Sequence, residues 1–268
     1  MADLRGFQDV DRAADPGALV SYLDSASALE AARAYKRRSF VRLGLQAGHS
    51  VLDVGCGTGV DLQALAELVG PTGRVVGVES SAEMLAQARE RTRGLPVDVR
   101  LGDAQRLDLP DGSFDGCRAD RVFQHLEDPR QAMRELVRVA RPGGRVAVVD
   151  TDWGTLVVAA ADRAVTRRIA DYQCDRRVRN GWMGRSLFAL ARDCGLADLA
   201  TDTATATFTD LSLATELLYL RQAADEAAAA GVISPAVGAA WMTQLEQAAA
   251  AHRFFSALRV FGVSGRKP

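Results

Sequence analysis

The sequence contains few of the residues that build disulfide frameworks or metal centres. Its 268 residues include four cysteines, with no C-x-x-C pair among them, and only three histidines, which lie far apart. Disulfide frameworks and zinc sites need such residues in number and at characteristic spacings. We therefore expect reduced cysteines and no bound metal.

Long apolar runs and an excess of one charge are also lacking. No segment approaches the roughly 18 to 20 apolar residues that span a bilayer as a helix. Residues 1–15 carry four aspartates and lack the basic and then apolar profile of a secretory signal. The 33 basic and 34 acidic residues leave a net charge of −1, whereas nucleic-acid enzymes usually have a basic excess. We expect a cytoplasmic protein that contacts neither membranes nor nucleic acids.

Short apolar segments alternate with helical segments in the middle of the chain. Strands are predicted at residues 50–54, 74–78, 97–101, 114–119 and 145–150, with helices at 61–69, 80–93 and 129–140. This order is typical of an α/β protein whose parallel sheet is covered by helices on both faces. Ser80 and Glu83 form a capping-box pattern, which predicts Ser80 as the N-cap of the second of these helices.

The flanking segments are mostly helical in their patterns. Residues 7–47 predict helices, and the basic run Lys36–Arg38 within them is interpreted as a solvated face. After Trp153, helices are predicted at 159–179, 185–194, 211–230 and 235–252, and strands at 200–208 and 254–264.

The most distinctive segment is residues 51–59, which read VLDVGCGTG. Three glycines between a strand and a helix let the backbone approach a ligand closely, because no Cβ blocks the way and positive φ costs little. The carboxyl ends of parallel strands share one edge of the sheet. The glycine turn should therefore lie beside Glu79, Asp103 and residues 150–153, which end the neighbouring strands.

A dinucleotide is the alternative ligand for such a turn. Its fingerprint G-x-G-x-x-G would place glycine at position 60, where this chain has valine. Asp61 stands in the first turn of the following helix, where a pyrophosphate would need bare backbone N–H groups. Asp53 offers a carboxylate inside the strand, which suits a sulfonium or ammonium group. These residues favour a cationic ligand over a dinucleotide.

Residues 51–59 resemble motif I of the class I S-adenosylmethionine-dependent methyltransferases, and the later landmarks of that family follow in order. They are Val75–Glu79, Gly102–Ala104, Ser113–Asp115, Ala119–Leu126 and Arg141–Asp150. The likeness covers residues 45–150 in detail. It implies a Rossmann-like, seven-stranded, mostly parallel sheet with helices on both faces and helical lid additions, and it implies S-adenosylmethionine as the cofactor.

The resemblance also implies roles for single residues. Glu79 would accept hydrogen bonds from the ribose hydroxyls, and Asp103 with the N–H of Ala104 would meet the adenine. Cys56 is interpreted as a small space-filling residue between the glycines. The full set expected to bind the cofactor is Asp53, Gly55, Cys56, Gly57, Gly59, Glu79, Ser80, Met84, Asp103, Ala104, Ala119 and Arg121.

The acceptor side is less clearly marked. His125 is the catalytic candidate, because an imidazole near neutral pKa could take a proton as the methyl group arrives. The alternative is a structural histidine that shapes the floor of the pocket. Residues expected to contact the acceptor are Tyr22, Asp120, Gln124, Asp152, Trp153 and Trp182.

These features predict an enzyme that transfers a methyl group to a small molecule, such as a natural product or a quinone-like metabolite. The alternatives are a nicotinamide-dependent oxidoreductase and a non-methylating binding protein, such as a cyclase derived from a methyltransferase. The expected division is a helical cap at 1–48, a cofactor-binding core at 49–154, 185–210 and 254–268, and helical lid insertions at 155–184 and 211–253. The oligomeric state stays open, with a homodimer among the options.

Overall fold

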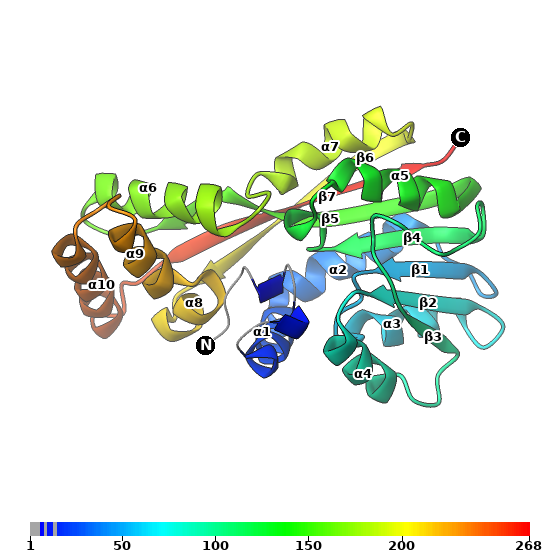
Figure 1. Cartoon of the computed structure of the whole chain (residues 1–268), viewed down its shortest axis with the longest axis horizontal. Helices are drawn as coiled ribbons and strands as arrows, with labels where there is room; N and C mark the ends of the chain where they lie inside the picture. Colours follow the sequence, from blue (N-terminus) through cyan, green and yellow to red (C-terminus); the bar gives the residue numbers. More distant parts are fainter. Residues whose placement is uncertain (1–5, 8–9, 13–14) are drawn as a thin grey trace.

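The computed structural model describes residues 6–7, 10–12 and 15–268. Its centre is a seven-stranded sheet in the order β3-β2-β1-β4-β5-β7-β6 (Figure 1). Neighbouring strands from β3 to β5 run parallel, and β7 runs antiparallel to both β5 and β6. The strands are β1 Ser50–Val54, β2 Arg74–Glu79, β3 Val97–Leu101, β4 Phe114–Asp120, β5 Ala140–Val158, β6 Ala197–Phe208 and β7 Ser256–Arg266. The predicted Rossmann-like fold is confirmed.

Helices cover both faces of this sheet. They are α1 Pro16–Ala28, α2 Glu30–Leu43, α3 Val60–Val69, α4 Ala82–Arg91, α5 Pro129–Val139, α6 Arg163–Tyr172, α7 Met183–Asp193, α8 Leu211–Leu218, α9 Leu220–Ala229 and α10 Pro235–Ala250. Three short turns add η2 Val10–Arg12, η3 Phe123–His125 and the π-helical η4 Gln173–Arg177. Leu52 and Val54 of β1 pack in the cluster that holds α5 and α7. Val51 lies in the cluster with α2 and α3. Alternate residues of one buried strand therefore meet different helices.

Strand β5 is much longer than predicted. It continues beyond Asp150 to Val158, where it still pairs with Ser256 of β7. Residues 155–158 were expected in a helical insertion, but their β-branched and apolar side chains suit the strand. Helices α6, α8, α9 and α10 form a second hydrophobic cluster around the far ends of β5, β6 and β7 (Figure 1).

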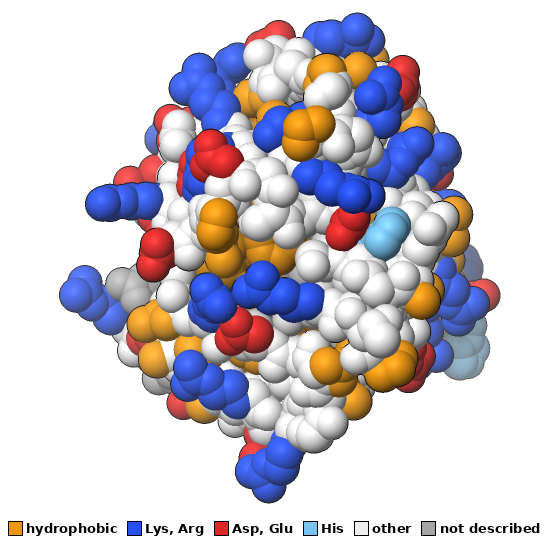
Figure 2. All heavy atoms as spheres, turned by 90° about the vertical axis from the view of Figure 1, so that its right-hand side faces the viewer, with side chains coloured by type: hydrophobic (Ala, Val, Ile, Leu, Met, Phe, Trp, Pro, Cys, Tyr) orange, Lys and Arg blue, Asp and Glu red, His pale blue; other side chains and the backbone are white. Residues whose placement is uncertain are grey.

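Two local predictions were wrong. The predicted helix at 211–230 is broken at Tyr219, whose φ of 54° lies in the left-handed region. The N-cap of α4 is Ser81, whose Oγ accepts from the backbone N–H of Met84 at 3.1 Å, and not Ser80. Ser80 instead turns its hydroxyl to Glu79. No helix in the described ranges is long and apolar enough to cross a bilayer. Basic and acidic side chains are interspersed over the end of the molecule drawn in Figure 2.

Candidate functional site

A cavity of about 480 Å³ lies at the carboxyl ends of the central strands. Its size falls within the range of small-molecule sites. It is lined by the turn after β1, the ends of β2 and β4, the middle of β5, helices α1 and α2, and parts of β6, β7 and α8. The predicted site residues that line it are Tyr22, Asp53, Gly55, Cys56, Gly57, Glu79, Ser80, Met84, Asp103, Asp120, Arg121, Gln124, His125 and Trp153. Most of the site residues predicted from the sequence therefore line the same cavity.

The glycine turn after β1 has no room for larger residues. Gly55 has a φ of 66°, and a Cβ there would lie 2.3 Å from Cγ2 of Val122. A Cβ at Gly57 would meet Leu23 of α1 at 3.3 Å. Gly59 is different, because it lies at the N-cap of α3 and packs against Ala88 of α4, and it does not line the cavity. The turn is thus a cradle whose backbone faces the cavity.

Glu79 fastens the end of β2 to this glycine turn. Its Oε2 accepts from the N–H of Gly57 at 2.9 Å. Its Oε1 accepts from the N–H groups of Ser80 at 2.8 Å and Ser81 at 3.0 Å. A carboxylate held by backbone donors has a fixed position and still presents further lone pairs to a ligand.

Met84 and Asp103 form the next part of the wall. Met84 is the third residue of α4 and is almost completely buried. Asp103 follows β3, and its Oδ1 accepts from the N–H of Gln105 at 2.8 Å. The neighbouring Ala104 packs into the hydrophobic cluster instead and does not line the cavity. We call this region, from the glycine turn to Asp103, the cofactor half of the cavity.

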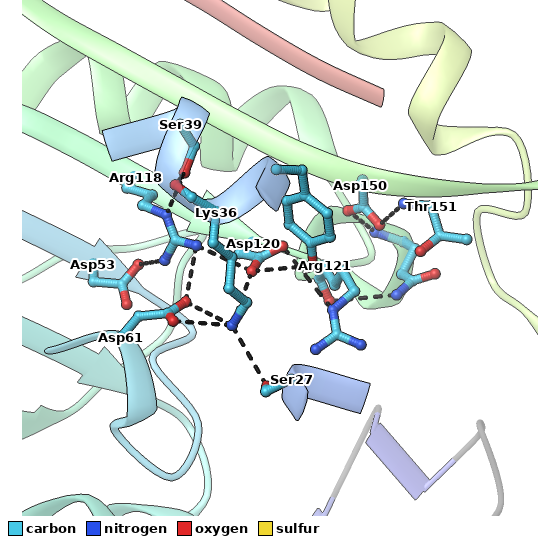
Figure 3. A network of polar contacts seen from close by, with 12 residues as sticks. Ser27, Lys36, Ser39, Asp53, Asp61, Arg118, Asp120, Arg121, Asp150 and Thr151 are labelled. Carbon is cyan, nitrogen blue, oxygen red and sulfur yellow. Dashed lines mark hydrogen bonds and ion pairs between the residues drawn. The ribbon is translucent and has the colours of Figure 1, made fainter. Parts of the chain in front are cut away.

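A buried network of charges separates the cofactor half from α2 (Figure 3). Its centre is Arg118, which has no solvent exposure. One guanidinium nitrogen lies 2.9 Å from Asp53, and the other lies 2.9 Å from Asp61 and 3.0 Å from Asp120. Lys36 of α2 adds contacts of 2.9 Å to Asp61 and 3.4 Å to Asp120. Three carboxylates therefore share Arg118 and Lys36, and Arg121 adds a third cation at 4.0 Å from Asp120, so the charges of the network balance.

This network corrects one prediction and adds residues that the sequence analysis missed. Lys36 is buried, so the basic run is not wholly a solvated face. Arg118 was not predicted as a site residue, because it lies within the predicted strand at 114–119 and not at its end. An arginine between small residues, two positions before Asp120, was nevertheless a signal, since a buried guanidinium needs acidic partners.

The network also sets the protonation of its acids. Burial raises the pKa of Asp53 to about 6, although the adjacent Arg118 acts to lower it. Burial alone would raise the pKa of Asp61 as well, but Arg118 and Lys36 hold it at about 2. The two carboxylates differ because Asp61 is approached by two cations.

Strand alternation decides which polar residues reach the cavity. Arg118 and Asp120 point towards α2, so Ala119 between them faces the opposite hydrophobic cluster and does not line the cavity. Likewise Trp153 lines the cavity, and Asp152 faces α7, where it pairs with Arg185 at 2.6 Å. Successive residues of a strand face opposite sides. Asp152 and Ala119, both predicted as site residues, therefore lie outside the cavity lining.

Trp182 does not line the cavity either. It stands at the N-cap of α7 with 57% of its surface exposed. Its ring stacks on the guanidinium of Arg185, whose Cζ lies 4.5 Å from the ring centroid. Its predicted contact with an acceptor therefore finds no support in the geometry.

His125 lines the cavity from the short turn η3 that follows β4. Burial, followed by the charges of Arg121 and Arg179, lowers its pKa to about 3. Its imidazole ring lies 5.4 Å from the ring of Phe7. The side chain is therefore neutral at physiological pH and is a weak base.

Gln124 and Trp153 are held in place by hydrogen bonds. The indole N–H of Trp153 donates to Oε1 of Gln124 at 2.8 Å. The backbone N–H of Gln124 donates to Oδ2 of Asp150 at 3.0 Å. Burial raises the pKa of Asp150 to about 7, although hydrogen bonds from Gln124 and Thr151 act to lower it.

Aromatic side chains close the side opposite the cofactor half. Tyr22 of α1 packs against Phe7 and against Tyr219, each with ring centroids 5.4 Å apart. Its hydroxyl donates to the carbonyl of Leu217 in α8 at 3.5 Å. Helix α1 thus touches the C-terminal helices across the cavity. We call the region lined by Tyr22, His125 and Trp153 the acceptor half.

No metal centre is formed by the residues that the structure describes. Within them, no three His, Cys, Asp or Glu side chains are arranged to hold a metal ion. All four cysteines are free.

Comparison with known proteins finds a methyltransferase domain and relatives named as methyltransferases. A family model described as a methyltransferase domain matches residues 52–148. The chain is 43% identical over 245 residues to an uncharacterized 37.1 kDa protein in transposon TN4556 of Streptomyces fradiae, covering 91% of this chain and 70% of that protein. It is 34% identical over 155 residues to demethylmenaquinone methyltransferase of Staphylococcus aureus (strain JH9), covering 58% of this chain and 62% of that enzyme.

A solved structure shows the same fold. The crystal structure of a protein from Bacillus halodurans C-125, described as a putative methyltransferase, aligns with a TM-score of 0.63 at 20% identity, covering 87% of this chain and 98% of that chain. The shared architecture places the cavity at the carboxyl edge of the sheet, where ligands of open α/β sheets bind.

Proposed function

We propose that this chain methylates a small-molecule acceptor bound beside S-adenosylmethionine, as a member of the class I S-adenosylmethionine-dependent methyltransferases. The observation that carries this proposal is that the cofactor half and the acceptor half line one continuous cavity. Natural products and quinone-like metabolites are the acceptor classes we favour. The relative from Staphylococcus aureus is named for a quinone substrate, and the acceptor half here is lined by aromatic rings.

The residues of the cofactor half fit S-adenosylmethionine. The glycine turn is closed to any Cβ at Gly55 and so offers bare backbone to the ligand. Glu79 is held where it can accept from ribose hydroxyls, and Met84 and Asp103 flank the space for a base. Asp53 also lines the cavity beside the turn, where its carboxylate faces a positively charged ligand.

When bound, S-adenosylmethionine supplies a methyl group on a positively charged sulfur that is open to in-line attack. The protein's task is then to align the acceptor and keep water out. Trp153 and Gln124, fixed by their mutual hydrogen bond, form one rigid wall for this purpose. His125 is neutral and can accept a hydrogen bond from an acceptor hydroxyl or amine. Because its pKa is low, His125 is better suited to position the acceptor than to act as a general base.

Two alternatives are weaker. A nicotinamide-dependent oxidoreductase would use the pyrophosphate fingerprint, but position 60 is valine and Asp61 is ion-paired beside the turn. A cyclase derived from a methyltransferase would keep the cofactor without consuming it. The named methyltransferase relative favours transfer of the methyl group.

The test combines binding with transfer. Calorimetric titration of the purified chain with S-adenosylhomocysteine should give a saturable heat, whereas NADH should give none. Incubation with methyl-labelled donor and a panel of phenols, hydroxyquinones and amines should then move label into an acceptor. No heat with S-adenosylhomocysteine would refute the cofactor assignment, and label that never leaves the donor would favour the cyclase alternative.

A further inference from the structure

Arg121 is held in an unusual backbone conformation directly after β4. Its φ of 58° lies in the left-handed region, which is strained and which residues other than glycine seldom adopt. Both sides of the residue are fastened. Its N–H donates to the carbonyl of Val149 at 2.8 Å, and its carbonyl accepts from Nε2 of Gln124 at 3.4 Å. The fold therefore pins this residue in place.

The strained turn directs the arginine into the cavity and packs Val122 against Gly55. Figure 3 shows the guanidinium of Arg121 pointing away from the cluster around Arg118. Its Nε lies 4.0 Å from Oδ1 of Asp120, and neither atom has a hydrogen-bond partner among the described residues. The other oxygen of Asp120 is already engaged by Arg118. The charge of Arg121 is thus only loosely balanced by the protein.

The surroundings of Arg121 belong to the acceptor half. Its charge acts on the rings of Tyr22, Tyr35 and His125, which line the cavity from α1, α2 and η3. Those rings are neutral, so they do not compete for the guanidinium. The glycine turn and Glu79, by contrast, are bonded to one another and to their own backbone. The sequence predicts Arg121 as a cofactor-binding residue, but its neighbours place it beside the acceptor.

We propose that Arg121 selects acceptors that carry an acidic oxygen, as an enolate, phenolate or carboxylate, and holds that oxygen as an anion. This rests on the methyltransferase function proposed above. A guanidinium is planar and always charged, and it pairs with such oxygens through strong, directed hydrogen bonds. In a cavity lined by aromatic rings the attraction is stronger than in water. The other cations of the cavity lining are paired, Lys36 and Arg118 with Asp61 and Arg179 with Glu127. Beside the neutral His125, this leaves Arg121 as the group that stabilises negative charge on the acceptor.

The probes for the test are 2-hydroxy-1,4-naphthoquinone, which is anionic at neutral pH, and its neutral methyl ether, 2-methoxy-1,4-naphthoquinone. Both have the same ring system and differ in charge at one oxygen. Calorimetry on the full chain saturated with S-adenosylhomocysteine should show the anion binding at least about tenfold more tightly than the ether, as expected for a charge-assisted hydrogen bond.

Arg121→Gln should abolish this preference, and Arg121→Lys should keep part of it. Affinity for S-adenosylhomocysteine should change less than about twofold in both, because the proposal assigns Arg121 no contact with it. Arg130→Gln, which removes a guanidinium paired with Asp193 on the surface, is the charge-matched control and should keep the full preference. Melting temperatures establish that each variant is folded.

Other outcomes overturn the proposal in distinguishable ways. If the wild-type chain binds the two probes equally, or binds neither, Arg121 does not select for an anion. If Arg121→Gln weakens S-adenosylhomocysteine while the probe preference persists, the guanidinium serves the carboxylate of the cofactor. If the wild-type chain does not bind S-adenosylhomocysteine at all, the methyltransferase function itself fails and this assignment fails with it.

Discussion

The two halves of the cavity are built by different means. The cofactor half comes from short strand-to-helix connections, where the Glu79 carboxylate accepts a hydrogen bond from the backbone of the glycine turn. The acceptor half gathers residues from α1, the turn after β4, strand β5 and helix α8, which are up to 195 residues apart in the chain. Local geometry therefore fixes the first half, and long-range packing fixes the second. Substitutions should affect the two halves separately, except where one network supports both.

Arg118→Met should have the largest effect, since Arg118 supports both halves. The change leaves Asp53, Asp61 and Asp120 without their shared partner. Removing one member of a buried ion pair costs about 3–5 kcal/mol of unfolding free energy. Urea denaturation measures the loss. Arg130→Met, at an exposed pair with Asp193, is the control and should cost far less. A loss of similar size in both variants would contradict the central role of Arg118.

Glu79→Ala should affect the cofactor half alone. The carboxylate is proposed to meet the ribose and is fixed by three backbone donors, so its removal should weaken S-adenosylhomocysteine binding by about 1–3 kcal/mol. Calorimetry gives the value. Glu83→Ala, at an exposed position in the first turn of α4, removes the same charge nearby and should leave the affinity unchanged. Equal affinities of wild type and Glu79→Ala would count against the cofactor site.

His125→Ala should affect the acceptor half alone. Turnover with an accepted substrate should fall by at most about a hundredfold, the low end for a general base, because a group with so low a pKa is a weak base. Binding of S-adenosylhomocysteine should not change. Any inflection of the rate near pH 6.5, the ordinary pKa of histidine, should persist in His125→Ala, because burial raises the pKa of Asp53 to about 6 and that of Asp150 to about 7. An inflection there that vanishes in His125→Ala would restore the role of a base.

Asp150 gives a pH test of the floor of the acceptor half. Burial raises its pKa from 3.8 to about 7, so between these values the folded chain holds a proton that the unfolded chain has released. The free energy of unfolding should therefore fall as pH rises through this window, by at most about 1.4 kcal/mol per pH unit from this residue. Asp150→Asn should remove that contribution, and urea denaturation at several pH values measures the slope. Identical slopes in the two proteins would contradict a protonated Asp150.

Trp182→Ala should have the smallest effect. Its ring is exposed outside the cavity and stacks on Arg185, so stability should change by only about 0.5 kcal/mol. Probe and cofactor affinities should stay at wild-type values. Trp153→Ala, which removes a cavity wall and the bond to Gln124, is the contrast and should weaken acceptor binding. A loss of acceptor binding in Trp182→Ala would place the acceptor elsewhere.

The sequence predicted the cofactor half better than the acceptor half for a physical reason. The glycine turn follows one predicted strand and Glu79 ends the next. Because parallel strands end at the same edge of a sheet, their positions in the sequence were enough to place them together. Asp152 was expected in a loop beside the cavity, but β5 continues for eight residues beyond Asp150. Within the strand, the side chain of Asp152 points to the face opposite Trp153. Lys36 was taken as solvated because its partners, Asp61 and Asp120, are distant in sequence. Tyr219 adopts a left-handed backbone in a segment whose composition suits a continuous helix.

The long pairing of β5 with β7 ties the two ends of the molecule together. Val148 and Val263 on these strands belong to the core cluster, and Leu156 and Leu258 on the same strands belong to the cluster of C-terminal helices. The ladder is irregular between Asp152 and Val157, beside Trp153, but pairing resumes beyond it. Because both clusters pack on β5 and β7, separating these strands at one cluster would expose the other cluster to solvent. The chain should consequently behave as one cooperative folding unit, with no stable half left behind when the other half melts.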